Sequence, residues 1–260
     1  MLIRSTWTLK VSEPTVLPRS YNLELVKNLH NRLGLEIGKD EIPSVTYSSL
    51  LGICSASKDF LTFSPDQFYQ LSICGLQAVS SKAIASLDLS AGLEFLGAKF
   101  EVCDRQDHIT SYEELYTRLI ANEPEPIHRF NLQFITPTAF AQGHNHLPLP
   151  LPSLMFRSWL ERWNEFAPVY LGGDELISYL ESGVAIKQHK IKTSLHQLQR
   201  GYTIGFTGQV TLQVLRYVEP LLANVAHLLV CYSQFASTGM KTRLGMGQTT
   251  VDEGIRECNG

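Results

Sequence analysis

A single histidine, His30, stands among the first 100 residues, with basic residues close by. Imidazole titrates near pH 6.5, so a histidine can take up or release a proton under physiological conditions. Lys27 precedes His30 by three residues and shares its face of a helix, whereas Arg32, two residues on, does not. This grouping predicts proton transfer at His30 beside positive charge. The alternative is a surface or half-buried histidine with no catalytic task.

Two other histidines, His144 and His146, stand two residues apart in the stretch GHNH. Such a pair could grip one metal ion, but protein zinc sites use at least three side chains. No third ligand is evident nearby, and a proline-rich loop follows. The five cysteines are widely spaced and form no C-x-x-C pair. We therefore expect no metal site, no cofactor and no disulfide framework, and a reducing cytoplasm fits this cysteine usage best.

The stretch AIKQHKIKT places lysines and one histidine close together without an acidic residue. In a strand, alternate side chains point to opposite faces, so both faces would be basic. A solvated strand edge is one interpretation. The other is contact with the phosphates of a nucleic acid, which positions the ligand without reading its sequence. The candidate RNA-binding residues of this region are Lys187, His189, Lys190, Lys192 and Arg200.

A second basic stretch, STGMKTRLGMGQTT, spans residues 237–250 and contains three glycines. Glycines accept positive φ angles and let backbone N–H groups converge on an anion. Lysine and arginine add positive charge, the arginine with bidentate geometry. A purely structural connection is the alternative. The candidate anion-binding residues here are Gly239, Lys241, Thr242, Arg243, Gly245, Gly247 and Gln248.

Length and composition bound these interpretations. The chain has 260 residues, of which 44% are apolar and 18% charged, as in a globular protein with a sizeable core. The net charge of −3 gives no general attraction to polyanions, so RNA binding would depend on local basic surfaces. No run of 18 apolar residues is present, and we expect no secretion signal and no membrane partner.

The periodicity of the first half predicts a strand over 1–11, a helix over 17–34 and strands over 43–53, 60–65 and 68–76. A helix over 77–89, a strand over 93–104 and a helix over 111–121 follow. The stretch NEPEPIHRF then breaks the pattern with two prolines. We place a domain boundary there, giving domains 1–122 and 123–260.

The second half repeats the same order of elements. A strand at RFNLQFITPTAF and a helix at PSLMFRSWLERWNEF precede a short helix, two long strands, a helix and a final strand near GQTTV. Each half thus reads as β-α-β-β-α-β, the order of a ferredoxin-like unit. The predicted fold is α+β with two tandem ferredoxin-like domains.

Three blocks of the sequence resemble one protein family. They are RFNLQFITPTAFAQGHNHLPLPLPSLMFRSWLERW, GYTIGFTGQVTL and ASTGMKTRLGMGQT, and they are similar to the Cas-six endoribonucleases of the RAMP superfamily, which process CRISPR precursor RNA. The first half matches more loosely, through LVKNLHNRLG and VTYSSLLG. The resemblance implies a metal-independent RNase that cuts each repeat by 2′-OH attack, leaving a 2′,3′-cyclic phosphate and a 5′-OH.

The resemblance also implies an active site on the first domain, near its first helix and the segment that follows. His30 is then the candidate proton-transfer residue, and Tyr47 and Ser48 lie in the matching VTYSSL block, with strand packing as the alternative for Tyr47. Basic residues would stabilise the phosphorane or hold RNA. These are Arg32 and Lys39 near the chemistry, and Arg19 and Lys27 for RNA.

Two alternative functions remain open from the sequence. One is a non-catalytic RAMP scaffold that binds crRNA in an effector complex; the other is an unrelated ferredoxin-like RNA-binding protein, although the aromatic pattern of such modules is not visible. The implied partners are CRISPR repeat RNA and crRNA, with other Cas effector subunits as further candidates. Monomer and homodimer both stay open.

Overall fold

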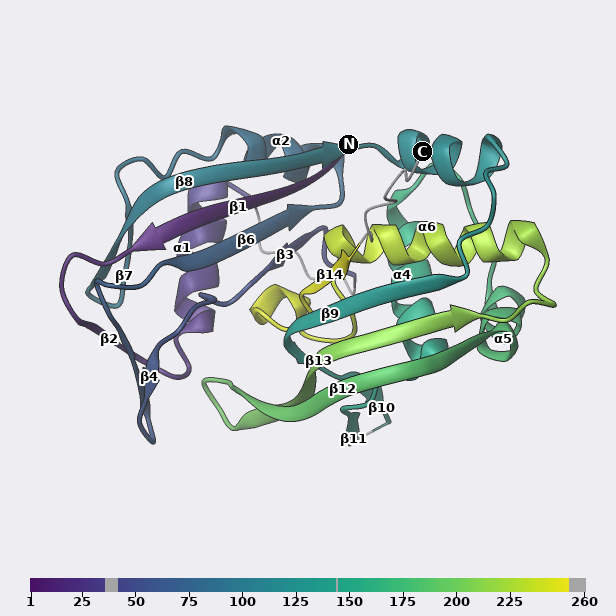
Figure 1. The fold of residues 1–260 in the computed structure, drawn as a ribbon. Helices are drawn as coiled ribbons and strands as arrows, with labels where there is room; N and C mark the ends of the chain where they lie inside the picture. The colour runs from purple at the N-terminus through teal and green to yellow at the C-terminus, as the bar shows by residue number, and fades with distance from the viewer. Residues whose placement is uncertain (36–41, 144, 253–260) are drawn as a thin grey trace, which may run out of the picture. The chain divides into compact units, whose positions relative to one another are not determined.

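A computed structural model describes residues 1–35, 42–143 and 145–252, which form two compact units (Figure 1). Unit 1 comprises residues 1–111, 195–203 and 241–246. Unit 2 comprises residues 112–194, 204–240 and the described residues from 247 onward. The chain therefore leaves unit 1 after Ser111 and contributes two later segments to it. The predicted boundary between residues 122 and 123 stays a prediction.

Unit 1 is built on a five-stranded antiparallel sheet in the order β3-β6-β1-β8-β7. Two helices, α1 and α2, lie on one face of this sheet (Figure 1). Leaving β7 aside, the chain order is β1, α1, β3, β6, α2 and β8, which is the ferredoxin-like order. The bounds are β1 Leu2–Lys10, α1 Asn22–Leu33, β3 Val45–Tyr47, β6 Tyr69–Gly75, α2 Ala78–Ser86, β7 Leu93–Phe95 and β8 Ala98–Thr110.

Helix α1 forms because its apolar residues recur every four positions. Leu25, Leu29 and Leu33 are buried in the core of unit 1, and the polar face carries Lys27. The helix ends at Gly34, whose φ of 64° is the left-handed conformation that glycine adopts without a steric cost. This arrangement presents the opposite side of the helix, including His30, away from the core leucines. A small sheet packs beside it, with β2 Thr15–Pro18, β5 Phe60–Phe63 and β4 Ser55–Ala56.

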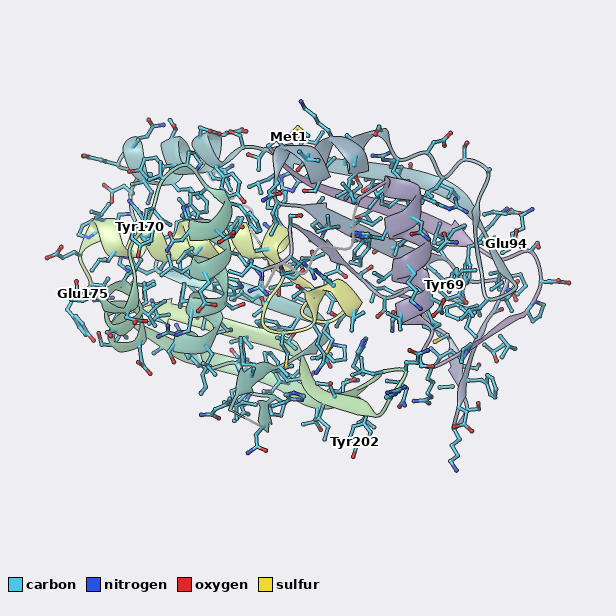
Figure 2. The ribbon with its side chains drawn as sticks, turned by 180° about the vertical axis from the view of Figure 1, so that it is seen from behind. Met1, Tyr69, Glu94, Tyr170, Glu175 and Tyr202 are labelled. Atoms are coloured by element: carbon cyan, nitrogen blue, oxygen red, sulfur yellow. The ribbon has the colours of Figure 1, made fainter. Side chains whose placement is uncertain are left out.

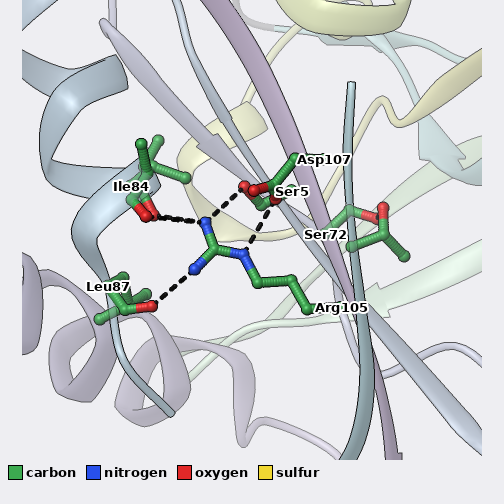
Figure 3. A network of polar contacts seen from close by, with 8 residues as sticks. Ser5, Ser72, Ile84, Leu87, Arg105 and Asp107 are labelled. Carbon is green, nitrogen blue, oxygen red and sulfur yellow. Dashed lines mark hydrogen bonds and ion pairs between the residues drawn. The ribbon is translucent and has the colours of Figure 1, made fainter. Parts of the chain in front are cut away.

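Arg105 on β8 attaches the C-terminal end of α2 to the sheet (Figure 3). Its guanidinium donates to the carbonyls of Ile84 and Leu87 at 2.9 and 2.8 Å and pairs with Asp107 at 2.9 Å. It also lies 4.9 Å from the centroid of the Trp7 ring. The last carbonyls of a helix lack partners within the helix, so this cation satisfies them. Helix α2 is thereby held against β1 and β8.

Unit 2 has a four-stranded sheet in the order β12-β13-β9-β14. When its strands are numbered along the chain, this order is second, third, first, fourth, and β3-β6-β1-β8 of unit 1 has the same order. Helix α4 packs against α5 and α6, and α6 packs against β14. The predicted fold of two tandem ferredoxin-like domains is confirmed by these two sheets. From Tyr112 onward the bounds are α3 Tyr112–Tyr116, a π-helix Thr117–Ala121, β9 Arg129–Thr138, β10 Phe140–Gln142, β11 Asn145–Leu147, α4 Pro152–Phe166, α5 Asp174–Gly183, β12 Val184–Gln197, β13 Tyr202–Val214, α6 Pro220–Ala236, a 3₁₀-helix (η2) Thr242–Leu244 and β14 Thr249–Asp252. Of these, η2 belongs to unit 1.

Several element boundaries differ from the sequence predictions. The helix expected from residue 17 begins at Asn22, because Thr15–Pro18 pair with β5 as strand β2. The strand expected over 93–104 is a hairpin of β7 and β8, since Leu96 and Gly97 both have positive φ. The helix expected over 111–121 changes from α to π geometry after Tyr116. Among the described residues, no helix is both long and apolar enough to cross a membrane.

Candidate active site

His30 and Tyr47 form a hydrogen-bonded pair in unit 1. The His30 Nδ1 atom lies 2.7 Å from the Tyr47 hydroxyl oxygen. Helix α1 supplies the histidine, and the end of β3 supplies the tyrosine. Tyr47 is only 2% exposed, and burial raises the pKa of its hydroxyl. The tyrosine therefore stays protonated at neutral pH, and its hydroxyl contacts the imidazole ring at Nδ1.

The pair opens onto a pocket of about 420 Å³ in unit 1. Its walls come from α1, from β3 with the residue before it, from the N-terminal end of α2 and from the 3₁₀-helix η2. Cationic and apolar side chains share this lining, which suits a ligand with a charged part and a flat apolar part. The lining residues are Leu23, Val26, Lys27, His30, Leu35, Ser44, Val45, Tyr47, Gln77, Val79, Ser80, Arg243 and Leu244.

Arg243 brings positive charge to the pocket from the far end of the sequence. It belongs to the segment 241–246 of unit 1, and its charge opposes the rise in the pKa of Tyr47. An electrostatic effect of this kind requires the guanidinium to lie near the phenol. The candidate RNA-binding residue Arg243 is therefore brought together with the candidate catalytic residues His30 and Tyr47.

Gly245 allows the segment 241–246 to approach α1 and β3 closely. Its φ is 91°, and a Cβ atom there would lie 2.7 Å from Ser49 Oγ and 3.1 Å from the Ser49 nitrogen. The same Cβ would lie 3.4 Å from Asn22 Oδ1 at the start of α1. Only glycine fits both the conformation and the space without strain. Gly245 thus acts as a close-packing residue next to Arg243.

Two polar contacts hold the same segment within unit 1. Lys241 Nζ donates to Thr203 Oγ1 at 3.1 Å, and burial lowers the pKa of Lys241. His196 is hydrogen-bonded to the backbone of Leu244, while burial lowers the pKa of the imidazole. Thr203 and His196 belong to the segment 195–203 of unit 1. These contacts therefore join the segment 195–203 to the segment 241–246. Thr242, another candidate RNA contact, is buried, and its Oγ1 has no hydrogen-bond partner.

Other residues expected near the chemistry lie outside the pocket lining. Ser48 is 2% exposed; its Oγ donates to the Ser49 carbonyl at 2.7 Å and accepts from the Ser72 nitrogen at 2.8 Å. Arg32 Nη1 donates to the Gly92 carbonyl at 3.0 Å. Lys39 lies outside the described residues.

The two early residues expected to hold RNA have different surroundings. Arg19 Nε donates to the Ser57 carbonyl at 2.9 Å, beside the small sheet of β2, β5 and β4. Lys27 lines the pocket and pairs with Glu24 at 2.8 Å on the exposed surface of α1. Lys27 is thus the closer of the two to the candidate chemistry.

The three lysines of β12 and His189 are exposed, whereas His196 on the same strand is buried. Strand β12 lies at the edge of the unit 2 sheet, and the side chains of both its faces reach solvent around residues 187–190. The hairpin that joins β12 to β13 carries Arg200 and Tyr202, and Tyr202, labelled in Figure 2, is 61% exposed. Exposed cations of this kind suit contact with nucleic-acid phosphates. The exposed basic residues are Lys187, His189, Lys190, Lys192 and Arg200.

The remaining residues of the glycine-rich stretch are packed inside unit 2. The Gly239 nitrogen donates to Ser158 Oγ at 2.8 Å, and its carbonyl accepts from Arg162 Nη2 at 2.7 Å. A Cβ at Gly247 would collide with the Thr238 carbonyl. Gln248 is 4% exposed, and its nitrogen donates to Thr136 Oγ1 at 2.9 Å. These residues hold the chain between α6 and β14 in place.

Sequence reasoning missed the residues at the α2 end of the pocket. Ser44, Gln77, Val79 and Ser80 are neither basic nor typical proton-transfer groups, so nothing in their type singled them out. The available signal was positional, since Gln77 and Ser80 stand three residues apart at the start of a helix, as in a capping box. As for metal ligands, the described part of the chain contains no cluster of three His, Cys, Asp or Glu side chains.

Comparison with known proteins gives one consistent relationship. The family model described as CRISPR-associated endoribonuclease Cas6 matches residues 132–249. The Cas6 endoribonucleases of Mycobacterium tuberculosis and Streptococcus thermophilus are 27% and 28% identical to this chain over 136 and 135 residues. Each alignment covers 52% of this chain, but 42% and 55% of the respective relative. The match thus spans about half the length of these curated relatives.

The likeness in fold extends over almost the whole chain. A Thermus thermophilus Cas6 solved as a product complex superposes with a TM-score of 0.71 at 21% identity. The superposition covers 97% of this chain and 100% of that one. At this level of identity the comparison concerns the fold, and it includes residues 1–111 of unit 1, which the family model does not match.

Proposed function

We propose that this chain is a member of the Cas6 family of CRISPR-associated endoribonucleases, and that it cuts CRISPR precursor RNA within the repeats and releases crRNAs. The observation that supports this most directly is the His30–Tyr47 pair, 2.7 Å apart, in a pocket that Arg243 also lines. The pocket thus offers a proton-transfer group and a cation together. Proton transfer and charge stabilisation are two of the requirements of RNA cleavage by its own 2′-OH.

The reaction forms one bond and breaks one. The ribose 2′-oxygen attacks the adjacent phosphorus, the bond from phosphorus to the 5′-oxygen breaks, and the products carry a 2′,3′-cyclic phosphate and a 5′-OH. One proton leaves the 2′-oxygen and one reaches the 5′-oxygen. His30 transfers a proton through Nε2, the ring nitrogen that Tyr47 does not engage. Because RNA supplies the nucleophile, histidine and arginine can perform the step without a metal ion.

Arg243 stabilises the charge that develops at phosphorus. The phosphorane has an additional negative charge on its equatorial oxygens, and a guanidinium can bind two of them at once. Its place in the pocket lining beside His30 suits this task. The close approach that Gly245 permits keeps the arginine near Tyr47.

Binding of the rest of the repeat falls to exposed basic surfaces. Lys27 lines the pocket, and the lysines of β12 lie on an exposed strand edge. Contacts of this kind bind the phosphate backbone and weaken as salt concentration rises. The matched relatives are CRISPR-associated endoribonucleases, and repeat RNA is the substrate we propose for this chain.

The test is cleavage of the repeat RNA from the source organism in the presence of EDTA. We expect one cut per repeat, a product with a 2′,3′-cyclic phosphate, and complete protection when the nucleotide before the cut carries a 2′-deoxyribose. Cleavage of the deoxy-substituted RNA would exclude the mechanism. Binding of processed RNA with no cleavage of any repeat would instead support the scaffold function.

A further inference from the structure

The pocket extends well beyond the atoms that could react. Helix α1 lines it with Leu23, Val26, Lys27 and His30, which share one face of the helix. From Leu23 to His30 the helix rises about 10 Å at 1.5 Å per residue. A phosphate group fills only a small part of such a length. The remainder has to accommodate another portion of the ligand.

One end of the pocket lies at the N-terminal end of α2, away from the His30–Tyr47 pair. Ser44 lines this end, and three residues of extended chain separate it from Tyr47, which amounts to about 10 Å. Ser80 Oγ lies 3.2 Å from the Ser44 carbonyl and 3.1 Å from the Gln77 carbonyl, to which it can donate its proton. These bonds fix the start of α2 beside the residue that precedes β3.

Gln77 presents a hydrogen-bond donor at this end. It precedes α2 in a capping box, in which its side chain accepts the Ser80 N–H and its own N–H donates to Ser80 Oγ at 3.2 Å. Only the amide oxygen can accept a hydrogen bond, so the amide nitrogen is the group that Gln77 can offer to a ligand. Gln77 is exposed and lines the pocket.

Apolar side chains form the walls between the two ends. Val26 from α1, Val45 from β3 and Val79 from α2 all line the pocket. Val79 is 70% exposed, although it is a large apolar residue. Covering it with a flat apolar surface removes that area from water, which favours binding by roughly 25 cal/mol per Å².

These features match the dimensions and chemistry of one nucleotide. A volume of about 420 Å³ lies in the range of small-molecule sites. A base placed about 10 Å from the reacting corner, between apolar walls, resembles the way proteins hold bases taken out of a stack. We propose that this pocket binds the unstacked base of one nucleotide next to the scissile phosphate, and that the Gln77 amide recognises a hydrogen-bond acceptor on its edge.

This base site rests on the proposed nuclease function for its relation to the scissile phosphate, but its occupancy can be tested without cleavage. The probes are the four nucleoside 3′-monophosphates and ribose 5-phosphate, which has no base, titrated into the full chain and followed by NMR. We expect at least one nucleotide to bind about tenfold more tightly than ribose 5-phosphate. Equal affinity of all four nucleotides and ribose 5-phosphate would overturn the proposal.

Two variants assign the site to its residues. Val79→Ser removes an apolar wall from an exposed position, so we expect about fivefold weaker binding of the preferred nucleotide and unchanged binding of ribose 5-phosphate. Gln77→Ser retains an oxygen that can cap α2 but removes the amide. It should narrow the differences in affinity among the four nucleotides by about fivefold.

The matched control is Val16→Ser, because Val16 is also an exposed valine of unit 1, on β2, and does not line the pocket. An effect of Val16→Ser equal to that of Val79→Ser, or no effect of Val79→Ser, would contradict the assignment. Nucleotide preference without cleavage of repeat RNA would leave the base site standing and remove the nuclease function. Cleavage of repeat RNA by a chain that shows no nucleotide preference would support the nuclease function and exclude the base site.

Discussion

The Tyr47 hydroxyl decides how the His30 ring can act. It lies 2.7 Å from Nδ1 and, because burial raises its pKa, it remains a neutral hydroxyl at neutral pH. In the proposed mechanism the tyrosine orients the ring, and Nε2 of the histidine transfers the proton. Removal of this hydroxyl should therefore lower the rate of cleavage strongly and change the affinity for RNA only slightly.

We expect Tyr47→Phe to lower the single-turnover rate constant about tenfold at saturating RNA, because the ring of His30 loses its partner while the phenyl packing is kept. The dissociation constant for RNA should change less than twofold. Rapid-quench cleavage assays and filter binding give the two quantities. Tyr69→Phe is the matched control, since the Tyr69 hydroxyl bonds the Ser64 nitrogen at 2.7 Å outside the pocket lining. A normal rate for Tyr47→Phe would remove the tyrosine from the mechanism.

The family resemblance selected His30 and Tyr47 as candidates, and the structure brings them together. From the sequence, Arg243 was assigned to RNA binding alone. Its place in the pocket depends on packing between residues far apart in the chain, and such packing leaves no local sequence pattern. Arg32 and Ser48 were proposed as neighbours of the chemistry. Their hydrogen bonds go to backbone groups, which residue type does not reveal.

At the scale of elements, the segment 241–246 connects charge to the pocket. Its 3₁₀-helix η2 packs against α1 and β3, and two side-chain contacts from residues 195–203 hold it there. Gly245 makes the packing possible. Displacing the segment should therefore impair the chemistry without touching His30.

We expect Gly245→Ala to reduce cleavage at least tenfold, because the new Cβ would meet Ser49 at 2.7 Å and push Arg243 from the pocket. It should also lower the free energy of unfolding by more than the roughly 1 kcal/mol that positive φ alone costs alanine. Gly97→Ala is the control, since Gly97 has a φ of 76° but nothing within 4 Å of an added Cβ. Thermal unfolding and cleavage assays compare the two variants. Equal cleavage rates and equal unfolding free energies of the two variants would show that the close approach of Gly245 to Ser49 does not affect activity or stability.

We expect the double variant Lys190→Ala, Lys192→Ala to bind RNA more weakly. The slope of log K against log salt is negative, and its magnitude should decrease by about 1 for each phosphate that the variant no longer binds. The cleavage rate constant at saturating RNA should stay the same, because neither lysine lines the pocket. The exposed Lys58 of unit 1 provides the control substitution. Unchanged affinity and salt slope in the double variant would mean that β12 is only a solvated edge.

The order of elements was predictable because apolar periodicity is local. Leu25, Leu29 and Leu33 specify α1, and Gly34 specifies its end. The hairpin turn at Leu96 and Gly97 was not predictable, because a leucine with positive φ contradicts its usual preference. The pairing of β2 with β5 was missed for a similar reason, since sheet partners distant in sequence decide it.

At the scale of the whole molecule, the repeated β-α-β-β-α-β order gave two ferredoxin-like units, and both sheets have the corresponding strand order. The sequence did not reveal that residues 195–203 and 241–246 belong to unit 1. That membership depends on packing between segments far apart in the chain. Unit 1 thus obtains part of its candidate active site from the last 20 residues of the sequence.

Five buried tyrosines link stability to alkaline pH. Burial raises the pKa of Tyr21, Tyr47, Tyr69, Tyr112 and Tyr232. Since an unfolded tyrosine loses its proton near pH 10, the unfolded chain ionises first as pH rises. The free energy of unfolding should stay level up to about pH 9 and fall above about pH 10. Urea unfolding from pH 8 to 11 measures this, and Tyr47→Phe should make the fall shallower. An equal slope in that variant would contradict the role of burial.

The most direct test of the central claim is the single-turnover cleavage of repeat RNA by His30→Ala in EDTA. We expect the rate constant to fall at least about 100-fold, the usual contribution of a general acid or base, while RNA affinity is preserved. His108→Ala, an exposed histidine of unit 1 on β8 that does not line the pocket, should cleave at the normal rate. Normal cleavage by His30→Ala would contradict the assignment of the active site to this pocket.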